Sequence, residues 1–302
     1  MRIVSLLPSL TELVCALGRG DELVGVTHEC DFPAGVEFLP HLTRSRIPEA
    51  ATGAEIDALV SAAGGGLYEL DRDLLAELRP DLILTQEQCD VCAVNEATVR
   101  RAALGLPGVP EVESVNPTDL AGVFAMFRRV GVLLGAEAEA EAIIDGFRAT
   151  TAEIARRTSG RGKPRAMILE WVDPPFSSGH WNPEIIARAG GSEVVGRSGE
   201  RSGRVAWGEI DRADPEVILV AACGFSIDRT EAELATMADR PEWRGLRAVR
   251  DGRVAVTDGS AYFSRPGPRL EASMRIASAA IDPDRCGDLA PPESLRIVPA
   301  RV

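Results

Sequence analysis

One short pattern occurs twice along the chain and constrains its fold more than any other feature. Residues 79–85 read RPDLILT, and residues 213–220 read ADPEVILV. In each copy a predicted helix ends at a proline, which cannot supply a helical N–H, and an acidic residue and an apolar β run follow. The chain is therefore predicted to build the same helix-to-strand junction in two separate α/β lobes.

The rest of the chain continues this alternation of short strands and helices. Predicted strands cover residues 3–6, 23–27, 82–85, 112–115, 166–170, 217–221 and 253–257, and predicted helices cover 10–17, 70–78, 95–103, 183–189, 207–212, 231–238 and 268–280. Such alternation is typical of mostly parallel sheets with helices on both faces, so the predicted fold class is α/β with two Rossmann-like lobes. Residues 31–66 are expected to be largely loop, with a helix over 54–63, and the tail after Asp282 is expected to be irregular.

A long helical stretch separates the two lobes. One predicted helix begins at Asn116 and ends near Leu134, and a second, over residues 137–158, carries apolar side chains at helical spacing. A helix of roughly 20 residues is about 30 Å long, comparable to the diameter of a small domain. The predicted domains are therefore an N-terminal lobe over residues 1–135, a rigid spine helix over 136–159 and a C-terminal lobe over 160–302.

Length and charge limit the classes of function. The 302 residues suffice for two separate cores, and the net charge of -13, with no basic stripe, argues against a nucleic-acid partner. No run of 18 uncharged apolar residues occurs, so no membrane insertion is expected. Residues 1–8 enter a predicted strand at once, without the pattern of a signal peptide, which predicts a cytoplasmic location.

No motif for catalysis is present. The sequence lacks a GxSxG elbow, a Walker A loop, an HExxH helix and a Rossmann GxGxxG fingerprint. The run Gly64-Gly65-Gly66 follows no predicted strand and lacks the lysine of a phosphate loop, so it is interpreted as a bend. We expect a binding protein that is not an enzyme and needs no nucleotide cofactor.

Candidate ligand contacts lie in the loops that follow the strands, because ligands of open α/β sheets gather at the carboxyl ends of strands. Aromatic residues form only 5% of the chain, yet several fall in these loops, and aromatic walls suit a large flat ligand. The predicted contacts are Pro8, Ser9, His28, Glu29, Gln86, Glu87, Phe176, His180, Trp181, Trp207, Tyr262, Phe263 and Arg265.

Four residues are candidates for contact with a metal. Cys89 and Cys92 form a CxxC pair just beyond a predicted strand, which fits structural packing, a redox pair or half of a metal site. No second CxxC exists to complete a four-thiolate zinc site. His180 lies between Gly179 and Trp181 and is a candidate ligand or donor to a bound metal centre, as is His28.

Taken in order, several phrases resemble the vitamin B12-binding branch of the periplasmic binding protein family, over roughly residues 2 to 281. They are SLLPSLTEL at 5–13, GVT at 25–27, DFP at 31–33, LRPDL at 78–82, PPFSSG at 174–179, AGG at 189–191, Trp207 and RPGPR at 265–269. The resemblance implies two lobes joined by a rigid helix, a class III periplasmic-binding-protein-like fold, and a corrinoid held between the lobes. It places Pro8, Glu29, Gln86, Phe176, Trp207 and Arg265 at ligand-contact positions.

The resemblance also implies partners and alternatives. Members of the family dock on an ABC-transporter permease through one exposed acidic residue in each lobe, and the corresponding positions here are Asp73 in the first lobe and Ala213, beside Asp214, in the second. The resemblance therefore makes Asp73 and Asp214 the candidate docking residues. The family norm is a periplasmic or extracellular location. The predicted ligand is cobalamin or another corrinoid. Haem, a ferric siderophore or a metal ion are alternatives for the same fold, and a corrinoid-handling redox protein that uses Cys89 and Cys92 is a further one.

Overall fold

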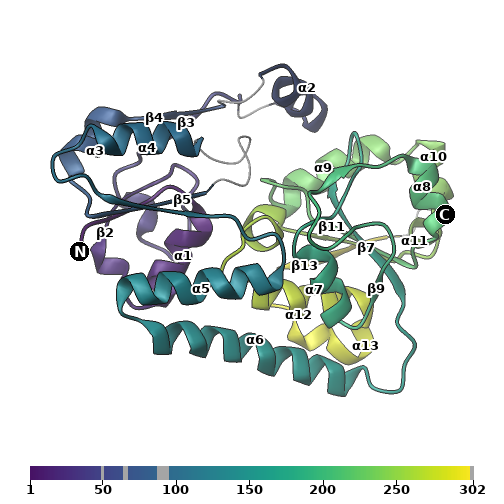
Figure 1. Cartoon of the computed structure of the whole chain (residues 1–302). Helices are drawn as coiled ribbons and strands as arrows, with labels where there is room; N and C mark the ends of the chain where they lie inside the picture. Colours follow the sequence, from purple (N-terminus) through teal and green to yellow (C-terminus); the bar gives the residue numbers. More distant parts are fainter. Residues whose placement is uncertain (49–50, 64–66, 87–94, 300–302) are drawn as a thin grey trace. The chain divides into compact units, whose positions relative to one another are not determined.

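The computed structural model describes residues 1–48, 51–63, 67–86 and 95–299. The chain divides into two compact units, one of Met1–Pro117 with Gly122–Ile143 and one of Thr118–Ala121 with Ile144–Val302. The long helix α6 (Glu137–Arg157) contributes its first residues to one unit and the rest to the other (Figure 1). Two α/β units joined by a long helix confirm the predicted fold class.

The first unit is built on a parallel four-stranded sheet. The strands are β1 (Ile3–Ser5), β2 (Leu23–Val26), β5 (Leu82–Gln86) and β6 (Glu111–Val115), in the order β2-β1-β5-β6. Its longer helices are α1 (Pro8–Ala16), α2 (Gly53–Ala63), α3 (Arg72–Leu78), α4 (Glu96–Leu104) and α5 (Leu120–Leu134), with short turns η1 (Gly20–Glu22) and η2 (Val36–Phe38). Leu75 of α3 and Val99 of α4 pack with Val4 and Ile83 in one buried cluster on a face of this sheet.

A small antiparallel sheet corrects part of the sequence analysis. Strands β3 (Thr43–Ser45) and β4 (Tyr68–Leu70) pair with each other, although the first lies in a predicted loop and the second was not predicted, its last residue being the first of the predicted helix. Each strand has three residues, too few for a periodic signal, and their partners are distant in sequence. The helix predicted over 54–63 is confirmed as α2.

The second unit is built on a mixed seven-stranded sheet. Strands β7 (Arg165–Trp171), β9 (Ser192–Glu193), β11 (Val217–Val220) and β12 (Val254–Thr257) are parallel. Strand β8 (Phe176–Ser177) pairs antiparallel with β7, β10 (Gly203–Arg204) antiparallel with β8, and β13 (Leu295–Val298) antiparallel with β12. The order is β10-β8-β7-β11-β12-β13, with β9 paired to β7. The core is therefore centred on β7, β11 and β12.

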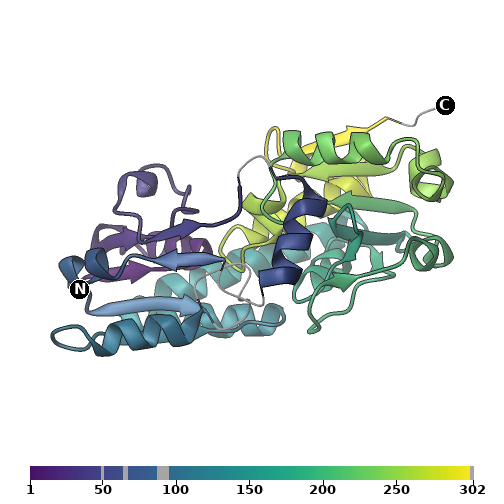
Figure 2. The ribbon, with the colours of Figure 1, turned by 90° about the horizontal axis from the view of Figure 1, so that it is seen from above.

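Helices cover both faces of this sheet (Figures 1 and 2). On one face, Ile210, Leu234, Met237 and Trp243 pack with strand residues in a single buried cluster. The helices of the unit are α7 (Asn182–Arg188), α8 (Trp207–Ala213), α9 (Ile227–Met237), α10 (Pro241–Gly245), α11 (Arg247–Arg250), α12 (Leu270–Ile281) and α13 (Pro283–Cys286), with the turns η3 (Gly259–Phe263) and η4 (Gly287–Leu289).

The C-terminal tail, expected to be irregular, instead ends in the edge strand β13. Residues 295–298 pair antiparallel with β12, and Arg296 forms ion pairs with Asp228 (2.6 Å) and Glu231 (2.8 Å), both in α9. This strand is only four residues long, with one polar residue, and two of its four side chains are exposed. Its pairing depends on partners about 40 residues earlier, which local sequence does not reveal.

The repeated junction is confirmed in both units. Helix α3 ends at Arg79 (φ 43°) and helix α8 ends at Asp214 (φ 41°), both in the left-handed conformation directly before the proline. An arginine at the start of the neighbouring strand binds the last helical carbonyl in each case. Arg2 Nε donates to Leu78 O at 2.7 Å, and Arg165 Nε donates to Ala213 O at 3.1 Å.

The left-handed backbone of Arg79 predicts that replacing this residue with glycine stabilises the folded protein. Arg79→Gly should raise the free energy of unfolding by about 0.5–1 kcal/mol, because glycine adopts this conformation without the steric cost of a Cβ atom. Ala76→Gly, in the interior of the same helix, is the matched control and should lower it by about 1 kcal/mol. Urea unfolding followed by circular dichroism measures both. A loss of stability in Arg79→Gly equal to that in Ala76→Gly would contradict the prediction.

Candidate functional site

A partly buried carboxylate anchors the loop that follows β7 in the second unit. Glu170 Oε1 accepts hydrogen bonds from Asn182 Nδ2 at 2.7 Å and from the Gly179 N–H at 3.3 Å, and its Oε2 accepts from the Ser202 hydroxyl. Burial raises the pKa of Glu170, while these three hydrogen bonds lower it, and the nearby negative charge of Glu193 raises it. Glu170 thus fixes both ends of the loop that carries His180.

Glu193 holds the adjoining segment in a similar way. Its Oε1 accepts three backbone N–H groups, from Val194 (3.0 Å), Val195 (2.9 Å) and Gly196 (2.9 Å), and its Oε2 accepts from the Ser178 hydroxyl at 3.3 Å. Burial raises the pKa of Glu193, against the effect of these backbone donors. Two adjacent acidic side chains therefore define the backbone path around Ser178 and Gly179.

The same loop is joined to the turn after β12. Trp181 Nε1 donates to Phe263 O at 3.1 Å, and Asn182 Nδ2 donates to the same carbonyl at 3.3 Å. The Ser273 hydroxyl donates to Tyr262 O at 2.6 Å, which holds the turn against α12. The structure thus brings together the two loops that carry four of the residues predicted to bind ligand.

Exposure separates these predicted residues into two groups. Trp181 (5% exposed), Phe263 (1%) and Arg265 (8%) are buried in the second unit. Phe176, His180, Trp207 and Tyr262 are partly exposed. The first group belongs to the interior of this unit, and each member of the second group keeps some accessible surface.

His180 and Trp207 each have a defined setting. His180 has a left-handed backbone (φ 51°), its N–H donates to Glu200 O at 2.6 Å, and its ring lies 5.5 Å from that of Trp181. Burial lowers the pKa of His180, as does the positive charge of Arg201, and both effects favour the neutral imidazole. Trp207 meets Trp243 edge-on, with ring centroids 5.8 Å apart.

An aromatic group at the same edge was not predicted from the sequence. The ring centroids of Trp171, the last residue of β7, and Phe225 lie 4.8 Å apart. The guanidinium carbon of Arg229 lies 3.8 Å from the centroid of the Phe225 ring. The Trp171 Nε1 atom is buried without a hydrogen-bond partner among the described residues. The sequence did hold one indication of this group, because Trp171 directly follows the predicted strand 166–170, where ligand-binding residues are expected.

In the first unit, the predicted residues occupy the ends of the strands. Pro8 and Ser9 begin α1 just after β1, and Gln86 is the last residue of β5. All three are buried in this unit. Glu87, Cys89 and Cys92 lie outside the described residues, so the predictions for them remain predictions.

His28 and Glu29 follow β2 and meet a residue that the sequence analysis had not selected, Tyr68 of β4. The Tyr68 hydroxyl donates to Glu29 Oε1 at 3.2 Å, and the rings of His28 and Tyr68 lie 5.5 Å apart. His28 Nδ1 is 2.7 Å from the hydroxyl of Thr43 in β3. The unpredicted small sheet therefore positions a predicted candidate histidine.

Both residues predicted to dock on a permease are exposed, but their settings differ. Asp73 lies in the first turn of α3, and no ion pair to it is found within the described part of the chain. Asp214 lies 3.4 Å from Arg247, which also pairs with Glu216 at 3.1 Å. Among the residues described, no helix is long and apolar enough to cross a membrane.

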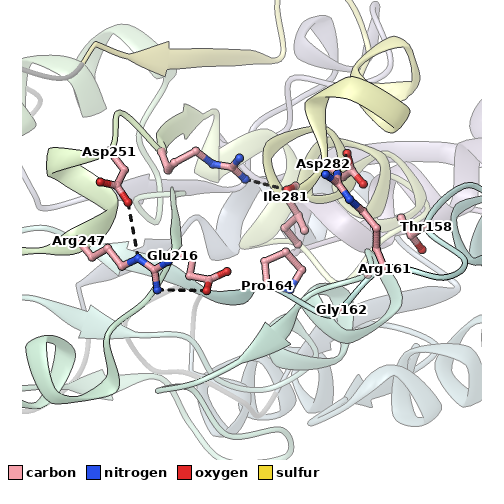
Figure 3. Close-up of a pocket in the computed structure, with 11 residues that line it drawn as sticks. Thr158, Arg161, Gly162, Pro164, Glu216, Arg247, Asp251, Ile281 and Asp282 are labelled. Atoms are coloured by element: carbon pink, nitrogen blue, oxygen red, sulfur yellow. Dashed lines mark hydrogen bonds and ion pairs between the residues drawn. The ribbon is translucent and has the colours of Figure 1, made fainter.

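A pocket of about 430 Å³ lies at the opposite, amino-terminal edge of the second sheet (Figure 3). None of the predicted ligand residues lines it. Its arginines already have partners: Arg161 pairs with Asp282 at 2.9 Å, Arg247 with Glu216, and Arg253 donates to Ile281 O at 2.8 Å. Because ligands of α/β sheets bind at the carboxyl ends of strands, this pocket is not the candidate site.

Two α/β units on a shared helix, with polar and aromatic side chains at the carboxyl ends of their strands, define a solute-binding protein. The chain belongs to the Periplasmic binding protein family, whose sequence model matches residues 3–261. Proteins of this family bind small molecules for ABC-transporter permeases and are not enzymes.

Individual relatives bind two kinds of tetrapyrrole. A vitamin B12-binding protein of Yersinia pestis (strain Pestoides F) is 25% identical over 239 residues, which are 76% of this chain and 73% of that protein. A periplasmic heme binding protein from Pseudomonas aeruginosa has a TM-score of 0.71 at 22% identity, over 94% of this chain and 93% of its own. The periplasmic vitamin B12 binding protein BtuF of Vibrio cholerae has a TM-score of 0.66 at 18% identity, over 93% of this chain and 96% of its own. The two structural likenesses show the fold.

Proposed function

We propose that this chain binds a corrinoid, cobalamin or one of its precursors, and delivers it to an ABC-transporter permease. The observation that carries the proposal is the edge of the second unit where Phe176, His180, Trp207 and Tyr262 are partly exposed. Flat aromatic faces offer a macrocycle a large apolar area at little entropic cost. The curated relatives support the corrinoid over haem, because those matched along most of the chain are named for vitamin B12.

The chemistry at this edge fits a neutral macrocycle with polar substituents. Phe176 and Trp207 supply aromatic contact, while backbone groups and hydroxyls near Ser177 can bond to amide side chains of a corrin ring. Of the residues predicted in the first unit, we assign His28 and Glu29, which are accessible, to ligand contact, whereas Pro8, Ser9 and Gln86 are buried. A bare metal ion is a weaker candidate, because no group of three or more His, Cys, Asp or Glu placed to hold one occurs among the described residues.

Removal of an aromatic wall tests the site. Phe176→Ala and Trp207→Ala should each raise the dissociation constant for cyanocobalamin about tenfold, because each loses about 1.4 kcal/mol of stacking and buried area. Isothermal titration calorimetry measures the constant. Leu104→Ala, an exposed apolar residue of α4 (72% exposed), is the control and should bind as the native protein does. Equal affinity in the two aromatic variants and in the control would exclude this edge as the binding surface.

A further inference from the structure

The imidazole of His28 is fixed in orientation by the small sheet of the first unit. Its Nδ1 lies 2.7 Å from Thr43 Oγ1, and its backbone N–H donates to the same oxygen at 3.2 Å. Thr43 is buried (4% exposed) and begins β3, and the preceding residue, Leu42, donates its N–H to Val26 O at 2.9 Å. The hydroxyl that holds the ring is therefore itself held by backbone pairing.

The other ring nitrogen has no hydrogen-bond partner. His28 Nε2 is buried, and no donor or acceptor among the described residues bonds to it. Glu29 Oε1 lies 3.7 Å away, too far for a hydrogen bond, and instead accepts from Tyr68. A buried polar atom without a partner costs roughly 1–3 kcal/mol, so such an atom calls for an explanation.

Metal coordination explains this arrangement. A histidine that binds a metal through one nitrogen almost always donates its other N–H to an oxygen, which fixes the ring and its tautomer. When His28 Nδ1 donates to Thr43, Nε2 keeps its lone pair. Burial lowers the pKa of His28, the negative charge of Glu29 raises it, and the charge of His41 lowers it further. The net effect is a lowered pKa, which favours the neutral ring that coordination needs.

The surroundings of His28 further define the metal. The described residues hold no cluster of three or more His, Cys, Asp or Glu that would complete a site made of protein ligands. One imidazole fits a metal that arrives with its other ligands and keeps one exchangeable axial position. The metal centre of a tetrapyrrole has that form. His28 also lies just after β2, at the carboxyl edge of the sheet where ligands of this fold bind.

We propose that His28 Nε2 is the axial ligand that this chain gives to the cobalt of a bound corrinoid. The inference rests on the proposed function. In cob(II)inamide, which carries water at an axial position, the Nε2 lone pair forms the bond to cobalt as that water leaves, and no electron is transferred. Because Nε2 is buried, coordination requires the side chains that cover it to move, and Glu29, whose carboxylate lies 3.7 Å away, has a side chain that is 41% exposed. His180 is less suited, since no hydrogen bond orients its ring within the described part of the chain.

Electron paramagnetic resonance of bound cob(II)inamide tests this assignment. Cob(II)inamide lacks the nucleotide base of cobalamin, so an axial nitrogen must come from the protein. The native protein should split the cobalt lines into nitrogen triplets, and protein labelled with ¹⁵N-histidine should convert these to doublets. His28→Ala should lose the splitting and still bind cob(II)inamide by calorimetry. Thr43→Val should keep the splitting with an affinity about 10-fold to 100-fold weaker, because the ring loses its orienting bond.

His180→Ala is the matched control and should keep the triplets. Splitting that persists in His28→Ala, or that disappears only in His180→Ala, would overturn the assignment to His28. Binding by the native protein without nitrogen splitting would overturn the inference and leave the proposed function intact. No binding of cob(II)inamide or cobalamin by calorimetry would instead overturn the proposed function itself.

Discussion

Gly179→Ala is expected to destabilise the second unit and to remove most of its affinity for ligand. A Cβ atom at residue 179 would lie 2.4 Å from Ser202 N, 2.5 Å from Glu200 O and 2.6 Å from Arg201 C. All three are backbone atoms that a rotamer change cannot move away. The segment 200–202 must therefore shift, and the bonds to His180 and Glu170 shift with it.

The expected loss of stability is about 1–3 kcal/mol, the usual cost of inserting a methyl group into closely packed structure. The loop should also lose cobalamin affinity by at least about tenfold, which corresponds to 1.4 kcal/mol of binding energy. All four tryptophans of the chain, Trp171, Trp181, Trp207 and Trp243, belong to the second unit, so urea unfolding followed by tryptophan fluorescence reports on that unit.

Gly203→Ala is the matched control for this change. Gly203 lies in the neighbouring strand β10, and an added Cβ atom there meets nothing within 4 Å. The free energy of unfolding of Gly203→Ala should stay within about 0.5 kcal/mol of that of the native protein. If Gly179→Ala behaved like Gly203→Ala in both unfolding and binding, the close packing of the ligand loop would be refuted.

Glu170→Leu is the second substitution with a large expected effect. It removes the acceptor for the Gly179 N–H and for the Ser202 hydroxyl, and each donor left unpaired costs about 1–3 kcal/mol. Asn182 keeps its bond to Phe263 O. The unanchored loop should bind cobalamin more weakly. Urea unfolding and calorimetry measure the two effects, and a native-like affinity would show that Glu170 does not position the loop.

Glu170→Gln separates the shape of this side chain from its charge. The amide oxygen can still accept from Asn182 and Gly179, and the amide N–H can donate to Ser202, so stability at neutral pH should match or exceed that of the native protein. The native carboxyl has a raised pKa in the folded state. The folded state therefore holds more protons than the unfolded one between the two pKa values, and this group's contribution to stability falls as pH rises through that interval.

The native protein should accordingly gain stability relative to Glu170→Gln as the pH falls from 7 toward the range in which Glu170 becomes protonated. Unfolding of both proteins by urea across this pH range measures the difference. A difference that does not change with pH would contradict the raised pKa of Glu170.

Sequence reasoning succeeded where local signals are strong. The junctions at Arg79-Pro80 and Asp214-Pro215 could be predicted because proline ends a helix irrespective of distant contacts, and helix α6 because its apolar spacing extends over more than five turns. Strands β3, β4 and β13 could not be predicted, because three or four residues carry little periodicity and the strands with which they pair are remote in sequence.

The candidate site was predictable in location more than in detail. Strand ends located Phe176, His180 and Tyr262, but composition alone did not show that Trp181 and Phe263 turn into the core. The role of Glu170 depends on Gly179, Asn182 and Ser202, which lie 9 to 32 residues away, and that of His28 depends on Thr43, 15 residues away. Such contacts follow from the tertiary fold and have no local sequence signature.

The most direct test of the central claim is a titration of the native protein with cyanocobalamin and, in parallel, with haemin. Both ligands absorb in the visible range, so the spectrum and calorimetry give a dissociation constant for each. The proposed function predicts saturable binding of cyanocobalamin with one site for each chain and a weaker affinity for haemin. Tighter binding of haemin, or no binding of cyanocobalamin, would contradict it.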